Sequence, residues 1–130
     1  MTITRTNPRA LVVDDDEGIR SVVDIALGLV GGFDVTQAAS GEEAVDLLAE
    51  RVFDVVVLDV MMPGLDGPGT LQRIRSTYNG VDVPVVFLTA KAQPHERRDL
   101  ESLGATGVIV KPFDPLTLAD DVRSLARLDS

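Results

Sequence analysis

Four apolar runs recur along the chain, and each stops at polar or charged residues. They occupy residues 10–13, 55–58, 85–88 and 108–110. Apolar runs without alternation are typical of strands buried on both faces, as in parallel sheets that helices cover on either side. A further segment, residues 33–38, alternates apolar and polar positions, which predicts a strand nearer the edge of the sheet.

Helical patterns separate these strands, and several of the predicted helices carry a recognisable first turn. Asp16 is placed to cap the first helix, and Ser40 with Glu43 forms a capping box before the second. Asp114 and Pro115 are expected to cap and to begin the last helix. The polar ends of the strands and the starts of the helices therefore alternate along the whole chain.

Strands that alternate with helices five times predict an α/β fold, a doubly wound five-stranded parallel sheet with helices on both faces. The flavodoxin-like strand order 2-1-3-4-5 places the switch point of such a sheet between its first and third strands. We expect one domain over residues 9–128, after a flexible leader over residues 1–8.

The polar strand ends provide the candidate site. Because the carboxyl ends of parallel strands share one edge, we expect Asp14, Asp15, Asp59, Thr89 and Lys111 to lie in one cleft. Three confined carboxylates raise one another's pKa, and a divalent cation relieves the repulsion. An all-oxygen set with few protein ligands favours Mg²⁺, with phosphate as a further partner. Asp59, at the end of a central strand, could then attack a phosphoryl group to give an acyl phosphate.

The composition of the chain argues against several classes of function. The chain has 130 residues, a formal net charge of -9 and no cysteine. The acidic balance argues against direct binding to nucleic acid, and the lack of cysteine excludes thiolate chemistry. Because no apolar stretch is long enough for a secretory signal or a membrane span, we expect a cytoplasmic protein with no membrane partner.

The motifs together resemble the receiver domain of two-component response regulators. They are residues 12–15 (VVDD), 58–67 (LDVMMPGLDG), 88–90 (LTA) and 111–113 (KPF). Each motif alone is weak, but the joint pattern is specific and extends over nearly the whole chain. The chain resembles in particular the single-domain receivers of the chemotaxis-regulator kind.

The resemblance implies a signalling phosphoacceptor, whose only catalysis concerns its own phosphorylation and autodephosphorylation. Asp59 would accept a phosphoryl group from a histidine kinase or a histidine phosphotransfer protein. Asp15, Asp59 and the backbone carbonyl of Met61 would coordinate Mg²⁺, and Asp14 would act through a metal-bound water. Phosphorylation would switch the protein contacts of the last two helices, with the protein a monomer or a phosphorylation-dependent dimer.

The resemblance also implies roles for the remaining cleft residues. Thr89 and Lys111 would bind the phosphoryl oxygens and carry the switch. Val108 departs from the family pattern, because receivers usually carry Tyr or Phe three positions before the Lys-Pro pair. Met61 and Lys91 occupy the positions that line the path of the attacking water, so they are expected to change the lifetime of the acyl phosphate.

Three other functions remain open from the sequence. A phosphohydrolase with an Asp nucleophile needs a second Asp at position 61, where this chain has Met. A flavodoxin-like FMN carrier would have to bind phosphate against three aspartates, residues 14–16. A receiver-like module that acts without phosphorylation is the remaining alternative. We expect no output domain after the last predicted helix, and this expectation fits either a free-standing regulator or a piece of a longer protein.

The remaining charged residues have a simple interpretation. His95, the only histidine, is expected to be exposed at a helix start and not catalytic. The arginines at positions 97, 98, 123 and 127 alternate with acids, as on solvated helix faces, and they also fall where receivers meet partners. The downstream partner is not encoded in any motif.

Overall fold

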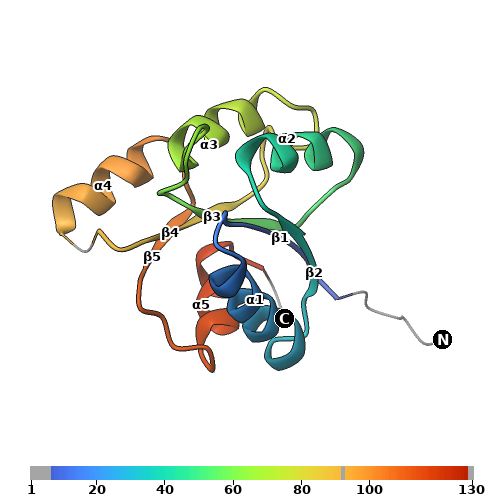
Figure 1. Ribbon diagram of the computed structural model, residues 1–130, viewed down its shortest axis with the longest axis vertical. Coiled ribbons are helices and arrows are strands. Elements are labelled where there is room, and N and C mark those ends of the chain that lie inside the picture. The colour runs from blue at the N-terminus through green and yellow to red at the C-terminus, as the bar shows by residue number, and fades with distance from the viewer. Residues whose placement is uncertain (1–6, 92, 129–130) are drawn as a thin grey trace.

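The fold is described from a computed structural model, over residues 7–91 and 93–128. Five strands alternate with five α-helices, as the sequence predicts (Figure 1). The elements are β1 Arg9–Val13, α1 Glu17–Ile25, β2 Asp34–Ala38, α2 Gly41–Glu50, β3 Val55–Asp59, α3 Gly67–Arg75, β4 Val85–Thr89, α4 Pro94–Ser102, β5 Gly107–Val110 and α5 Leu118–Leu125. A π-helical segment, Ala26–Val30, continues α1.

All neighbouring strands are parallel, in the order β2-β1-β3-β4-β5. The predicted strand order is therefore confirmed, with β2 at an edge and β3 in the centre. Helices α1 and α5 cover one face of the sheet, and α2, α3 and α4 cover the other (Figure 1). Every strand ends at the same edge, so the residues that follow the strands are brought together.

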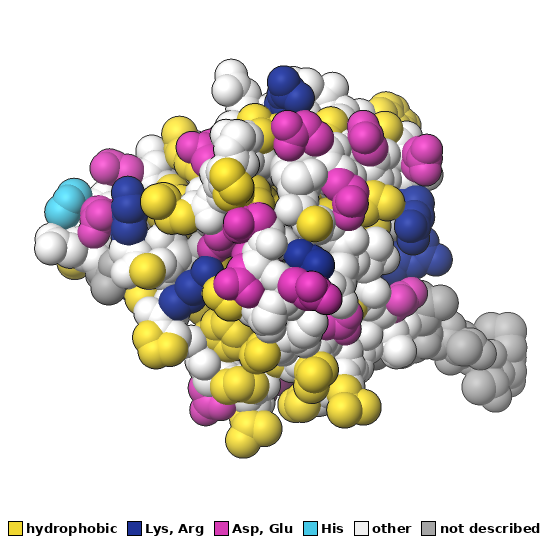
Figure 2. Space-filling model, in the orientation of Figure 1, with side chains coloured by type: hydrophobic (Ala, Val, Ile, Leu, Met, Phe, Trp, Pro, Cys, Tyr) yellow, Lys and Arg dark blue, Asp and Glu magenta, His cyan; other side chains and the backbone are white. Residues whose placement is uncertain are grey.

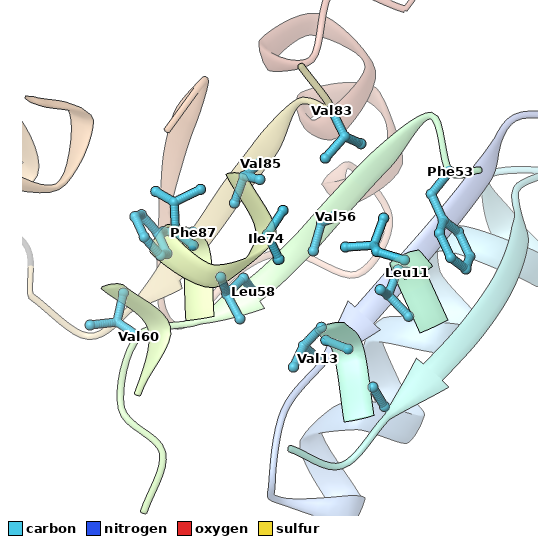
Figure 3. Packing of buried hydrophobic residues seen from close by; sticks show 14 of the residues in the cluster. Leu11, Val13, Phe53, Val56, Leu58, Val60, Ile74, Val83, Val85 and Phe87 are labelled. Atoms are coloured by element: carbon cyan, nitrogen blue, oxygen red, sulfur yellow. The ribbon is translucent and has the colours of Figure 1, made fainter. Parts of the chain in front are cut away.

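Two hydrophobic clusters hold these layers. Every residue of β3 and β4 is buried, which is why their sequences show no alternation. Alternate residues of one strand face opposite clusters: Val56 and Leu58 pack with α2 and α3, whereas Val55 and Val57 pack with α1 and α5. Figure 3 shows part of the first cluster, with Val85 and Phe87 of β4 beside Val56 and Leu58 of the neighbouring β3. The central strands are thus fixed from both sides.

The predicted caps of the first two helices are confirmed. Asp16 accepts a hydrogen bond from the Ile19 N–H at 3.0 Å, and Ser40 Oγ accepts one from the Glu43 N–H at 3.1 Å. The Glu43 carboxylate reaches back to the N–H of Ala39, one residue before the cap, at 3.2 Å. Local side-chain chemistry therefore sets where these helices begin.

The start predicted for the last helix is wrong. Asp114 caps a turn instead, because its Oδ1 accepts from the Leu116 N–H at 2.9 Å. Thr117 is the N-cap residue, with φ -114° and ψ -8°, and α5 begins at Leu118. Pro115 therefore precedes α5 and lies in the turn, not in its first helical position.

The first helix also ends differently from a regular α-helix. Its last five residues are π-helical, and Gly31 comes directly after them. A Cβ on Gly31 would lie 2.2 Å from the Cβ of Ala119 on α5. Gly32 then adopts φ +76°, which ends the helix as the Gly-Gly pair predicts. The glycines thus let α1 and α5 approach closely on one face of the sheet.

Of the predicted leader, residues 1–6 lie outside the described residues, and the leader stays a prediction. Within the described ranges, no helix combines the length and apolarity needed to cross a bilayer.

Gly67, the first residue of α3, lies against the end of β3. A Cβ there would be 2.6 Å from the carbonyl oxygen of Asp59 and 2.7 Å from the Cα of Val60. Because both are backbone atoms, we expect Gly67→Ala to lower the free energy of unfolding by about 1–3 kcal/mol, measured by urea denaturation. Gly18→Ala is the control, since its Cβ would meet only Asp16 Oδ1 at 3.3 Å. That variant should keep or raise stability, and equal losses in both would contradict the packing argument.

Candidate metal and phosphoryl site

Three aspartates meet at the carboxyl edge of the sheet. Asp14 and Asp15 follow β1, Asp59 ends the adjacent β3, and one carboxylate oxygen of each lies within 4.8 Å of the others. Asp14 is 1% exposed and Asp59 4% exposed, whereas Asp15 is open to solvent. The predicted acid cluster is therefore present, with two members held in the protein and one at its surface.

Lys111 enters this cluster from the other side of Asp59. Its Nζ donates to Asp59 Oδ1 at 2.6 Å and lies 3.9 Å from Asp14 Oδ2. The backbone N–H of Lys111 donates to the Thr89 carbonyl at 2.7 Å, which extends the β4–β5 pairing by one residue. Lys111 is thus anchored by its backbone while its ammonium partly neutralises the acids.

Asp14 is buried, and one of its two carboxylate oxygens lacks a hydrogen bond within the described residues. Its Oδ1 accepts from the Asp16 N–H at 2.9 Å, but its buried Oδ2 accepts no hydrogen bond from any described residue. Burial raises the pKa of the Asp14 carboxyl, and the charges of Asp59 and Asp15 raise it further, against the opposing effects of the Asp16 N–H and Lys111. A buried carboxylate oxygen that accepts no hydrogen bond and lies beside two further acids favours the binding of a cation.

Thr89 ends β4 beside the cluster and is 1% exposed. Its hydroxyl oxygen accepts a hydrogen bond from the Lys91 N–H at 3.0 Å. The O–H donor of the same group stays available, because accepting a bond does not consume it. A buried hydroxyl with a free donor at this edge can bind an anionic oxygen.

The loop from β3 to α3 has one rigid and one exposed part. Gly67 N–H donates to the Val60 carbonyl at 3.0 Å, and Asp66 caps α3 by accepting from the Gly69 N–H at 2.8 Å. Between them, the Met61 side chain is 67% exposed. Met61 also lines a groove of 610 Å³ together with Lys91 and the exposed His95, so the two predicted modulator positions lie on one side of the site.

Val108 is half-buried on β5, paired with Phe87 of β4. It lines a hollow of 490 Å³ that Arg97, Asp121 and Leu125 also border.

A second hollow of 530 Å³ lies beside Lys111 and is mainly apolar, formed by residues of α1 and of the segment before α5. Figure 2 shows hydrophobic side chains gathered at the lower edge of the molecule and acidic ones over its centre and upper part.

Sequence reasoning missed Arg20, on α1. Its Nη1 donates to the backbone carbonyl of Asp14 at 2.8 Å, and its Nε donates to Gln37 Oε1 at 2.8 Å. Gln37 Nε2 in turn donates to Asp24 Oδ2. The spacing of Arg20 and Asp24 by four residues is visible in the sequence, but the third partner comes from β2 and has no local signal.

Comparison with known proteins identifies the family. Residues 10–123 match the family model of the response regulator receiver domain. A probable transcriptional regulator ycf27 of Guillardia theta is 42% identical over 94% of this chain and 46% of that protein. The DNA-binding dual master transcriptional regulator RpaA of Synechocystis is 37% identical over 92% of this chain and 49% of that protein. The chain thus spans about half the length of these relatives.

Two solved structures share the whole fold. The chemotaxis response regulator CheY4 of Vibrio cholerae has a TM-score of 0.85 at 33% identity, over 92% of this chain and 99% of that chain. The receiver domain of the sensor histidine kinase PA1611 of Pseudomonas aeruginosa has a TM-score of 0.82 at 28% identity, over 93% and 98%. That receiver holds a magnesium ion coordinated in its active-site cleft. The present chain belongs to the response regulator receiver family.

Proposed function

We propose that this receiver is an Mg²⁺-dependent phosphoacceptor whose acceptor is Asp59. The observation that carries the proposal is the position of Asp59: it is nearly buried at the end of the central strand, with Lys111 Nζ at 2.6 Å and two further carboxylates within 4.8 Å. This arrangement supplies a nucleophile, a cation for phosphoryl oxygens and a set of metal ligands in one place.

In the proposed reaction, a carboxylate oxygen of Asp59 attacks the phosphorus of a phosphohistidine. The new bond joins that oxygen to phosphorus, the nitrogen–phosphorus bond breaks, and its electron pair returns to the imidazole, which takes a proton from solvent. Lys111 and the Thr89 O–H would bind the oxygens of the transferred group, in keeping with the position of Thr89 at the end of β4 and of Lys111 directly after the neighbouring β5. The product is an acyl phosphate on Asp59, which water later hydrolyses.

The donor set fits a hard divalent cation. Asp15 and Asp59 would ligate it directly together with the Met61 carbonyl, and Asp14 would act through a bound water. All are oxygen donors, and the observation that favours a cation here is that the buried Asp14 Oδ2 accepts no hydrogen bond from the described residues. When bound, Mg²⁺ would neutralise the phosphoryl oxygens and reduce repulsion between them and the carboxylates.

The partners follow from this chemistry. The phosphoryl donor would be a histidine kinase or a histidine phosphotransfer protein, in the cytoplasm. Phosphorylation would change the protein contacts of α4 and α5, whose hollow over Val108 is bordered by Arg97 and Asp121. The relatives named as transcriptional regulators are about twice as long as this chain, so an output on transcription would need a segment beyond it.

Incubation with acetyl phosphate and Mg²⁺ tests the proposal most directly. Intact-mass spectrometry should show a gain of about one phosphoryl group in the wild type and none with EDTA. Asp59→Asn should abolish the gain while keeping the fold, because the two side chains are nearly isosteric. Asp46→Asn, an exposed change of the same charge on α2, is the matched control and should be labelled like the wild type. Labelling of Asp59→Asn would reject the assignment, and no labelling of the wild type would favour the phosphorylation-independent module.

The charge of Asp14 should lower the free energy of unfolding of the metal-free protein. The pKa of Asp14 is raised above the ordinary 3.8, so its ionised form destabilises the fold at neutral pH, and this cost disappears as pH falls below the folded pKa toward 3.8. We therefore expect Asp14→Asn to raise the free energy of unfolding in EDTA at pH 7, and to raise it less as the pH approaches 3.8. A pH-independent gain would show that charge is not the cause.

Magnesium should stabilise the wild type more than Asp14→Asn. The wild type should gain about 2.7 kcal/mol of stability at a hundredfold excess of Mg²⁺ over its Kd, and Asp14→Asn should gain less. Urea denaturation with and without the ion measures both. Equal gains in the two proteins would exclude Asp14 from the metal site.

A further inference from the structure

We propose that Arg20 is a positioning residue for the metal-binding acids, and that Gln37 and Asp24 hold Arg20 in place for this task. The inference rests on the proposed function, since it concerns the same Mg²⁺ site. Arg20 touches neither the phosphoryl group nor the reacting oxygen, and it acts through the backbone of Asp14. Its Nη1 donates to the Asp14 carbonyl at 2.8 Å.

That hydrogen bond completes the fixing of Asp14. The Asp14 N–H donates to the carbonyl of Ala38 on β2 at 3.2 Å, and the Asp14 side chain accepts from the Asp16 N–H. The carbonyl is the remaining backbone group, and Arg20 is the side chain that reaches it. With its N–H, its carbonyl and one carboxylate oxygen all bonded, Asp14 directs its other oxygen into the cluster.

The hydrogen bond from Arg20 to the Asp14 carbonyl also affects the orientation of Asp15. The Asp14 carbonyl belongs to the peptide plane that joins Asp14 to Asp15, so a donor on that oxygen sets the rotation of the plane. Asp15 is exposed, and no hydrogen bond from the described residues reaches its carboxylate. Its direction therefore depends on its backbone, and Arg20 is the group that fixes this peptide.

Arg20 is itself held by two further groups. Its Nε donates to Gln37 Oε1 at 2.8 Å, and Gln37 Nε2 donates to Asp24 Oδ2. Arg20 and Asp24 lie four residues apart on α1, so both face the same side, and Gln37 on the edge strand β2 bridges them. Because a guanidinium is planar, fixing Nε orients Nη1 as well, and the chain of hydrogen bonds connects α1, β2 and the acid loop.

Mg²⁺ demands nearly ideal octahedral geometry, so small errors in ligand direction reduce its affinity. Loss of a group that orients a ligand typically weakens metal binding by about 10–100-fold. We expect the lower end of this range for Arg20→Met, since the Asp16 N–H still holds one Asp14 oxygen. Lysine at this position would keep the charge without the planar fork.

The experiment is calorimetric titration of Mg²⁺ into the metal-free protein, without any phosphoryl donor. Arg20→Met should weaken binding about tenfold. Arg73→Met, which removes the same charge from an exposed position on α3, should leave affinity within twofold of the wild type. Gln37→Met should weaken binding about fivefold, and the double variant Arg20→Met/Gln37→Met should be no weaker than Arg20→Met, because both act through one bond.

A second readout separates positioning from general stabilisation. In labelling with acetyl phosphate, Arg20→Met should need about tenfold more Mg²⁺ for half-maximal rate, and its rate at saturating Mg²⁺ should stay near that of the wild type. Loss of stability alone would not shift the metal requirement. Should Arg20→Met fail to fold, Gln37→Met and Arg20→Lys carry the same two measurements.

The outcomes separate this inference from the proposed function. Wild-type Mg²⁺ affinity in Arg20→Met and Gln37→Met overturns the positioning role even if the wild type is labelled. Weaker binding in both variants supports it even if the wild type is never labelled, in which case the phosphoacceptor function fails alone. Absence of Mg²⁺ binding to the wild type overturns both.

Discussion

The confinement of like charge at the edge of the sheet is the constraint on which the rest of this structure depends. Asp14 and Asp59 are both nearly buried, and Asp15 joins them within 4.8 Å. In a low-dielectric setting this repulsion opposes folding unless cations offset it. Lys111 supplies one such cation, at 2.6 Å from Asp59 and 3.9 Å from Asp14, yet Asp14 Oδ2 accepts no hydrogen bond from any described residue. The fold therefore holds its acids in an arrangement whose free energy falls when a cation enters.

The packing of the sheet explains how the fold holds these carboxylates together in spite of their repulsion. Every residue of β3 and β4 is buried, and packing on both faces fixes these two strands. Asp59 and Thr89, which end them, are therefore held in place. Gly67 brings α3 against the Asp59 carbonyl, where any side chain would collide with backbone. By contrast, Asp15 and Met61 lie on exposed loops. Rigid positions hold the proposed acceptor, while exposed ones leave room for a donor protein.

The sequence allowed the sheet, its order and the acid cluster to be predicted, because these follow from local signals. Unbroken apolar runs mark buried strands, and parallel topology then brings their polar ends together. What could not be predicted depends on tertiary partners. The π-helical segment and the start of α5 result from packing and turn geometry around Gly31 and Thr117. The role of Arg20 needed Gln37, a residue on a different element.

Under the proposed function, the hydrogen bonds of Thr89 would couple the site to α4. The Thr89 hydroxyl oxygen now accepts from the Lys91 N–H, at the start of the segment that leads to α4. If the hydroxyl turns to bind a phosphoryl oxygen, that N–H loses its acceptor, and an unpaired backbone donor forces the segment to rearrange or to bind water. Val108 offers no aromatic ring to move with Thr89, whereas the Lys91 N–H to Thr89 hydroxyl bond and the Lys111 N–H to Thr89 carbonyl bond both connect Thr89 to the backbone that follows β4 and β5. Under the proposed function, the signal would therefore pass through the backbone of the β4–α4 segment, with no aromatic side chain at position 108 needed.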